Sequence, residues 1–158
     1  MNKSRGFTIV ELLIVIVVIA ILAAITIVAF NGIQERSQVA RAQSDMSNMQ
    51  KLVELYRGDN STYPLASSWV FQATSNRNTF IPGLVPEYAS TLPLAGPNAQ
   101  YIYKTNSTGT EFKIMRYRAA VNGGIPSGEW NNVPASMKDD NASNQDRYGV
   151  WSSGGRGL

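Results

Sequence analysis

The 158-residue chain contains no cysteine and no histidine. These two absences exclude disulfides, thiol nucleophiles, Cys/His zinc sites and imidazole acid–base catalysis, so we expect neither a cofactor nor an enzyme. Proline is absent before Pro64, and charged residues are absent between Leu12 and Gln34. The first third of the chain can therefore form one long helix whose first part is apolar.

Most of the net positive charge of the chain lies at its N-terminus. The chain carries 14 basic and 11 acidic residues, a net charge of +3. Lys3 and Arg5 lie ahead of the apolar segment, and without them 12 basic residues face 11 acidic ones, a net charge of +1. The body of the protein therefore lacks the strong positive field that is typical of nucleic-acid binding.

The apolar segment from Leu12 to Phe30 approaches the length of about 20 residues that a helix needs to cross a bilayer. It is too long for the apolar part of an ordinary signal peptide, which spans about 7–15 residues. Lys3 and Arg5 precede it, and no basic residue follows until Arg36. The positive-inside rule then predicts a single-pass membrane protein with a cytoplasmic N-terminus and an exported C-terminal body.

Glu11 is the unusual residue of this segment. A carboxylate well inside a bilayer costs roughly 2.5–3.5 kcal/mol on insertion scales, and less near the interface. A plain membrane anchor has no use for such a residue. An acid within the membrane is a functional hypothesis by default, and it requires a partner.

The stretch "RGFTIVELLIVIVVIAILAAI" resembles the N-terminus of type IV pilins and pseudopilins. A short basic leader, Gly6, Phe7 and then Glu11 four residues later occur together with the spacing of that family. The resemblance implies that a prepilin peptidase cleaves between Gly6 and Phe7 and that the new amino group of Phe7 is methylated. It also implies that Glu11 pairs with the Phe7 amine of a neighbouring copy in a helical filament.

Charge burial supports this pairing on physical grounds. An amine and a carboxylate are both costly in an apolar core, and removing one strands the other. A subunit out of register would strand both groups, so the pair of Glu11 and Phe7 favours one stagger between helices.

The helical pattern continues beyond the apolar segment and predicts one helix from Phe7 to about Arg57. An apolar stripe recurs mainly at spacings of three and four: Ile33, Val39, Ala42, Met46, Met49, Val53 and Tyr56. Gly58 suits a C-cap, and "GDNSTYP" predicts the end of the helix. The predicted parts are a leader (1–6), a membrane or filament-core half (7–30), an amphipathic half (31–58) and a globular head (59–158).

The head is predicted to contain a small antiparallel sheet, which makes the fold class α+β, a pilin fold with the long helix packed on the sheet. A proline-punctuated loop region covers 59–100, and a β-hairpin covers 101–120, with "QYIYK" and "TEFKIMRYRAA" joined by "TNSTG". Adjacent apolar residues at Ile114 and Met115 predict a bulge or a switch of face. The region 121–158 is loop-like until "RYGVWSS", a predicted last strand in which Tyr148, Val150 and Trp151 pack onto the sheet.

Two further patterns in the head were considered as binding sites. Asp139, Asp140 and Asp146, with two asparagines between the last two, offer oxygen ligands for Ca²⁺, and some pseudopilins bind calcium near this region. Their spacing matches no tight template, so no metal is predicted. Four basic residues cluster on the predicted hairpin: Lys104, Lys113, Arg116 and Arg118. Some pilins bind DNA, but Glu111 lies among these residues, and charged strand faces are usually just solvated.

The sequence is therefore interpreted as the precursor of a type IV pilin. Such a subunit sits in the inner membrane before assembly, where an assembly machinery incorporates it into a surface filament used for adhesion, twitching motility or DNA uptake. A pseudopilin of a type II secretion system shares the N-terminal chemistry and remains an alternative. A monomeric membrane-anchored binding module is a second alternative, which predicts no cleavage after Gly6.

Overall fold

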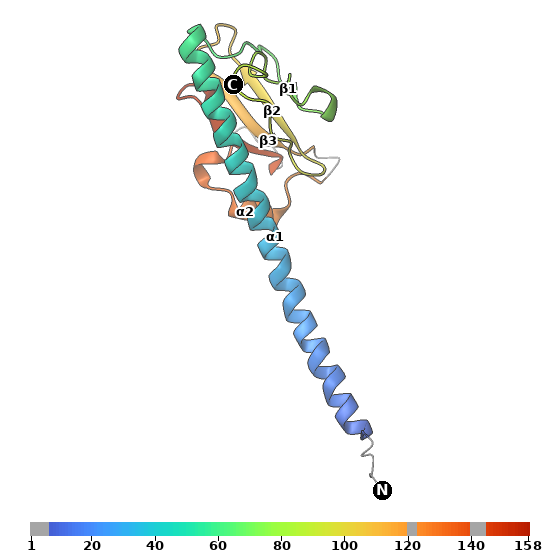
Figure 1. Ribbon diagram of the computed structural model, residues 1–158. Coiled ribbons are helices and arrows are strands. Elements are labelled where there is room, and N and C mark those ends of the chain that lie inside the picture. The colour runs from blue at the N-terminus through green and yellow to red at the C-terminus, as the bar shows by residue number, and fades with distance from the viewer. Residues whose placement is uncertain (1–6, 120–122, 140–144) are drawn as a thin grey trace. The chain divides into compact units, whose positions relative to one another are not determined.

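The structure is a computed structural model that describes residues 7–119, 123–139 and 145–158. The chain divides into two units, Met1–Glu35 and Arg36–Leu158, which are described separately. Helix α1, Ile9–Asn60, begins in the first unit and ends in the second (Figure 1). The long N-terminal helix and a small antiparallel sheet together confirm the predicted α+β pilin-like fold class.

The first unit consists, in its described part, of the beginning of α1. The helix starts at Ile9, so Phe7 and Thr8 precede it. From Ile9 to Glu35 it is about 40 Å long at 1.5 Å per residue, longer than the roughly 30 Å hydrocarbon core of a bilayer. Every described side chain between Phe7 and Phe30 is exposed, although nearly all of them are apolar.

The second half of α1 packs against the sheet through the predicted apolar stripe. The buried part of this stripe belongs to one core with residues of three strands. Five of its members are at most 3% exposed: Val39, Ala42, Met46, Met49 and Val53. Tyr56 is partly buried against the same core. The prediction was wrong for Ile33, which lies in the first unit and is 65% exposed.

The end of α1 differs from the prediction. Gly58 lies inside the helix, which continues to Asn60. Ser61 instead adopts a positive φ of 65°, and its N–H donates to the carbonyl of Arg57 at 2.8 Å. Asn60 supports this end because its side-chain amide donates to the Tyr56 carbonyl at 2.9 Å. A left-handed residue ends the helix as expected, but it is a serine three positions beyond the glycine.

Four strands form one antiparallel sheet in the order β1-β2-β3-β4. They are β1 (Val70–Phe71), β2 (Gln100–Thr105), β3 (Phe112–Tyr117) and β4 (Arg147–Trp151). The β2–β3 hairpin and the last strand were predicted, whereas β1 was not, because two residues are too few to show a period. The predicted loop after β3 contains a short helix, α2 (Ser127–Asn132), and a 3-10 turn, Ala135–Met137.

Adjacent Ile114 and Met115 produce no bulge. The β2–β3 register is unbroken, with Ile114 opposite Tyr103 and Met115 opposite Ile102. Neighbouring strand residues point to opposite faces, and all four of these residues are buried. The pattern therefore reflects a hairpin that is covered on both faces, which the prediction of a bulge or a switch of face missed.

The C-terminal strand is fixed by polar contacts as well as by packing. Tyr148 is fully buried, and its hydroxyl donates to Glu129 of α2 at 2.8 Å. Val150 packs against the core, and Trp151 lies over the ammonium of Lys113, 5.5 Å from the ring centroid to Nζ. The packing predicted for this strand is thus confirmed for Tyr148 and Val150, with a hydrogen bond to Glu129 and a cation–π contact in addition.

Candidate functional site

The start of α1 is a reciprocal capping arrangement between Thr8 and Glu11. Thr8 precedes the first helical residue, and its hydroxyl accepts a hydrogen bond from the backbone N–H of Glu11 at 3.2 Å. In return, Glu11 Oε2 accepts from the backbone N–H of Thr8 and from its hydroxyl, both at 2.8 Å. This is a capping box, which satisfies backbone donors that the first helical turn leaves open.

Thr8 is a residue of this site that was not predicted from the sequence. The signal was present as "TIVE", a threonine followed three residues later by glutamate and then by an apolar run. Glu11 therefore has a structural function within its own chain, since its carboxylate caps the N-terminal end of α1. This function does not neutralise its charge, because both of its donors are uncharged groups of Thr8.

No basic side chain in the described residues 7–119, 123–139 and 145–158 forms an ion pair with Glu11. Both hydrogen bonds from Thr8 go to Oε2. The carboxylate has further acceptor capacity, which a cation from another molecule can use. Among the residues that the structure describes, the start of α1 thus carries one capped negative charge with no basic partner.

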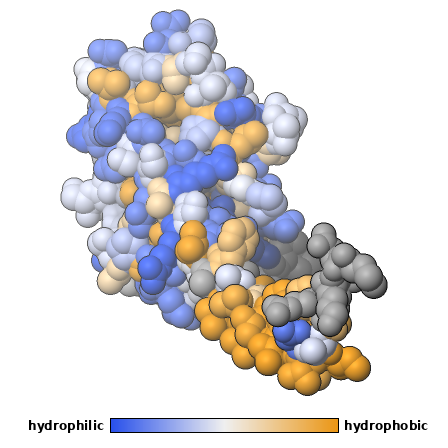
Figure 2. Space-filling view, turned by 60° about the horizontal axis from the view of Figure 1, so that its bottom comes forward, coloured by the Kyte–Doolittle hydropathy of each residue, from blue (hydrophilic) through white to orange (hydrophobic). Residues whose placement is uncertain are grey.

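An apolar surface surrounds this charge. Figure 2 shows apolar residues covering the described beginning of α1, in orange, whereas the rest of the visible surface is mixed and largely polar. None of the most apolar stretch of α1 is buried within the chain. Among the described residues, α1 alone is long and apolar enough to cross a membrane. A surface of this size needs lipid or other apolar helices to cover it.

The predicted processing site lies directly before this helix. Gly6 falls outside the described residues, so the structure tests neither its conformation nor cleavage after it. Phe7 is 87% exposed and precedes the helix, so the helical hydrogen-bond ladder does not include it. The roles of Gly6, Phe7 and Glu11 in processing and assembly stay predictions.

The candidate calcium ligands are engaged in other contacts. Asp139 is 6% exposed and lies 3.0 Å from Lys113 Nζ and 3.3 Å from Arg147 Nε. Asp146 lies 3.5 Å from the same Arg147 nitrogen. Asp140 and the two asparagines considered with it, Asn141 and Asn144, lie outside the described residues. Within the described chain, no group of three potential metal ligands is found.

The predicted basic cluster on the hairpin is not an exposed surface. Lys113 is fully buried and Arg116 is 4% exposed, because each pairs with a buried acid. Arg116 donates to both carboxylate oxygens of Glu129, at 2.8 and 3.3 Å. Burial alone would lower the pKa of Arg116, but the hydrogen bonds and the charge of Glu129 raise it. The expectation of a solvated basic face on the hairpin is therefore wrong for Lys113 and Arg116, whereas Lys104 and Arg118 are partly exposed.

Comparison with known proteins identifies the N-terminal segment. Residues 1–27 match the family described as the Prokaryotic N-terminal methylation motif. Over 63 residues, 40% of this chain, it is 35% identical to the Type II secretion system core protein G of Escherichia coli (strain K12). A match of 81 residues, half of this chain, links it at 32% identity to the protein of the same name from Aeromonas hydrophila.

A relative of a different name is similar over the same length. The chain is 38% identical over 63 residues to the Type IV wide pilus major component PilA4 of Thermus thermophilus. These matches cover 43%, 56% and 48% of the three relatives, so the chain spans about half of their length. No solved structure matches the chain.

Proposed function

We propose that this chain is the precursor of a structural subunit of a type IV pilus and thus a member of the type IV pilin and pseudopilin family, because its first 27 residues match the N-terminal methylation motif and its N-terminal part is similar to proteins of both kinds. The single observation that carries the proposal is the start of α1. There an exposed apolar surface of membrane length surrounds Glu11, a carboxylate that is capped by Thr8 but has no cation among the described residues.

The chemistry of assembly follows from this arrangement. Before assembly, lipid covers the apolar half of α1, with the basic N-terminus in the cytoplasm and the head exported. A prepilin peptidase in the inner membrane cleaves between Gly6 and Phe7 and exposes an amino group, which becomes methylated. The amino group of Phe7 is then available to Glu11 of a neighbouring copy.

Apolar packing and charge pairing have different tasks in this assembly. Packing of the apolar helices against one another holds the subunits together, but this surface leaves lipid rather than water, so the packing gains little from the hydrophobic effect and is tolerant of the exact stagger between helices. The pair of Glu11 and the Phe7 amine supplies the stagger, because only one register brings both charges together. Surface adhesion, twitching motility and DNA uptake are the functions that we propose for such a filament.

A second candidate function is that of a pseudopilin. Proteins named as type II secretion system core protein G match the same part of the chain. Since that part is the shared N-terminal helix, it does not discriminate between a pilus and a pseudopilus. A monomeric anchored binding module is a third candidate, and it requires no processing.

Two measurements on the native organism test these functions. The intact mass of the mature protein should correspond to a chain that starts at Phe7 and carries one additional methyl group, whereas an uncleaved N-terminus would support the anchored module. Electron microscopy should then show long surface fibres that carry this subunit. Fibres confined to the cell envelope would contradict the pilus and favour the pseudopilin.

A further inference from the structure

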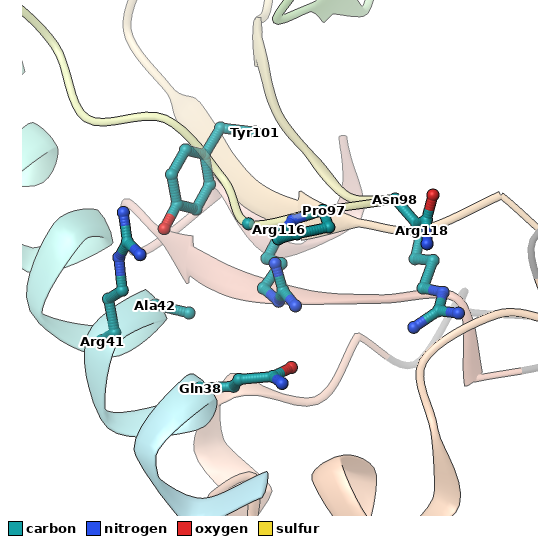
Figure 3. Close-up of a pocket in the computed structure, with 9 residues that line it drawn as sticks. Gln38, Arg41, Ala42, Pro97, Asn98, Tyr101, Arg116 and Arg118 are labelled. Atoms are coloured by element: carbon teal, nitrogen blue, oxygen red, sulfur yellow. The ribbon is translucent and has the colours of Figure 1, made fainter. Parts of the chain in front are cut away.

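A cleft of about 290 Å³ opens in the second unit, between α1, the turn at 96–98 and strands β2 and β3. Figure 3 shows residues of these elements facing a common space. The residues that line it are Gln38, Arg41, Ala42, Gly96, Pro97, Asn98, Tyr101, Arg116 and Arg118.

The polar groups of the cleft are mostly donors. Its described lining contains three guanidinium groups and two side-chain amides but no carboxylate. Guanidinium groups donate hydrogen bonds and cannot accept them, and an amide can turn its NH₂ group toward an acceptor. A cleft with this lining is chemically complementary to an anion rather than to a cation or an apolar ligand.

Arg116 forms the wall of the cleft and is held rigidly. Two of its five N–H donors are occupied by Glu129, through Nε and one terminal nitrogen. The remaining donors belong to the two terminal nitrogens, which can bind a second group with two oxygens. Glu129 thus fixes the plane of the Arg116 guanidinium, although it is not one of the residues that line the cleft.

One acid outside the lining, Asp45, contacts two of the lining residues. Asp45 accepts a hydrogen bond from the Tyr101 hydroxyl at 2.8 Å and lies 3.8 Å from Arg41 Nε. Arg41 also donates to the carbonyl of Leu94 at 3.5 Å. Arg41 and Arg116 are thus each paired with an acid outside the lining, and the described lining is distinguished by its surplus of side-chain hydrogen-bond donors.

Two side-chain amides also line the cleft. Figure 3 shows Gln38, from α1, and Arg116, from β3, directed into the same space, with Arg118 beside them. Asn98 adopts a positive φ of 60° in the turn, a conformation that asparagine tolerates better than most residues. We propose that this cleft is a binding site for a small oxyanion of the carboxylate or phosphate class.

The test uses the full chain in detergent micelles and inorganic phosphate as the probe, at constant ionic strength set with chloride. Titration calorimetry should show saturable binding in the millimolar range. Arg118→Gln removes one charge from the cleft and should weaken binding by about tenfold, the effect of one lost charge-assisted hydrogen bond. Arg36→Gln removes the same charge from an exposed position outside the cleft and should leave binding unchanged.

Gln38→Leu serves as a second variant, because it changes an exposed helix residue and no charge. It should weaken phosphate binding without changing the circular dichroism spectrum. Absence of saturable binding, or equal weakening by Arg36→Gln and Arg118→Gln, would overturn the proposal, since the second result indicates nonspecific attraction. Competition by glutamate is expected, because its carboxylates share the required chemistry.

The source of the anion is distinguished by sedimentation of the same samples. If the site takes a free solute, phosphate leaves the sedimentation coefficient unchanged. If the site takes a carboxylate of a second copy, concentrated samples self-associate and phosphate dissociates them. Either result supports an oxyanion site and identifies its occupant.

Discussion

Arg116 of β3 and Glu129 of α2 form a two-point ion pair with N–O distances of 2.8 and 3.3 Å, and their side chains are 5% and 0% exposed. The same Glu129 oxygen accepts the Tyr148 hydroxyl from β4 at 2.8 Å. The carboxylate of Glu129 therefore connects strands β3 and β4 to helix α2. This relationship makes a polar group, rather than an apolar one, central to the C-terminal part of the head.

We predict that Glu129→Gln destabilises the head by about 3–5 kcal/mol, because it leaves the Arg116 charge buried without its counter-charge. Urea unfolding followed by tryptophan fluorescence measures this difference. Glu87→Gln is the matched control, since Glu87 is exposed and its replacement should change stability by less than about 0.5 kcal/mol. Equal midpoints for the two variants would show that the buried pair does not stabilise the fold.

Removal of divalent metal should not affect the stability of the head. Asp139 is already neutralised by Lys113 and Arg147, so a cation at this position would have to displace two basic groups. The melting temperature is therefore expected to be the same in excess calcium and in excess chelator, because only a ligand of the folded state raises it. A rise with calcium concentration would contradict this assignment and place ligands in the segment 140–144.

The two roles of Glu11 can be separated by two substitutions. Glu11→Ala removes both the helix cap and the charge, and filaments are expected to be lost although cleavage after Gly6 is normal. Thr8→Ala removes the capping hydroxyl at a typical cost of about 1 kcal/mol but keeps the carboxylate. It should reduce filament yield far less, as measured by shearing and immunoblotting. Equal loss in both variants would assign the defect to helix initiation.

Alkaline pH should destabilise the head through its buried tyrosines. Burial raises the pKa of Tyr101, Tyr103 and Tyr148, and hydrogen bonding to Asp45 raises that of Tyr101 further. Above the unfolded value of about 10, the unfolded chain releases phenolic protons that the folded chain retains. Stability is thus fully present below pH 10 and is lost as the pH rises above it.

Unfolding in urea across this range provides the measurement and its control. Each buried tyrosine contributes a slope of up to about 1.4 kcal/mol per pH unit above pH 10. Tyr103→Phe should therefore reduce the alkaline slope by about that amount while its neutral-pH stability changes through the lost hydrogen bond to the Pro64 carbonyl. An unchanged slope would argue against a raised pKa of Tyr103.

Periodic features of the sequence predicted the fold well. The stripe from Val39 to Val53 is long enough for its spacing to show the buried face of α1, and the β2–β3 hairpin has a polar, glycine-containing loop between two apolar strands. Local rules were less successful. Gly58 looked like the end of the helix, but the core contact of Tyr56 and the left-handed Ser61 extend α1 to Asn60.

The polar residues of the head were the least predictable. Lys113 and Arg116 looked like part of an exposed basic cluster because both are basic residues of a predicted strand. Their partners, Asp139 and Glu129, are 26 and 13 residues away in the sequence. Pairing at this separation depends on how the C-terminal region folds back, for which a single sequence offers no period. At the N-terminus, by contrast, Thr8 and Glu11 are local neighbours, and "TIVE" carried enough information to find their contact.

The buried pair of Lys113 and Asp139 has a consequence for how the head matures. Lys113 Nζ also donates to the carbonyl of Arg156 at 2.6 Å, so one ammonium fixes the last residues of the chain to β3. This contact consists of a hydrogen bond and an ion pair and needs no covalent cross-link. Because the sequence contains no cysteine, the head needs neither a thiol oxidase nor a disulfide isomerase to form this contact, and its folded state should be indifferent to reductants in the surroundings.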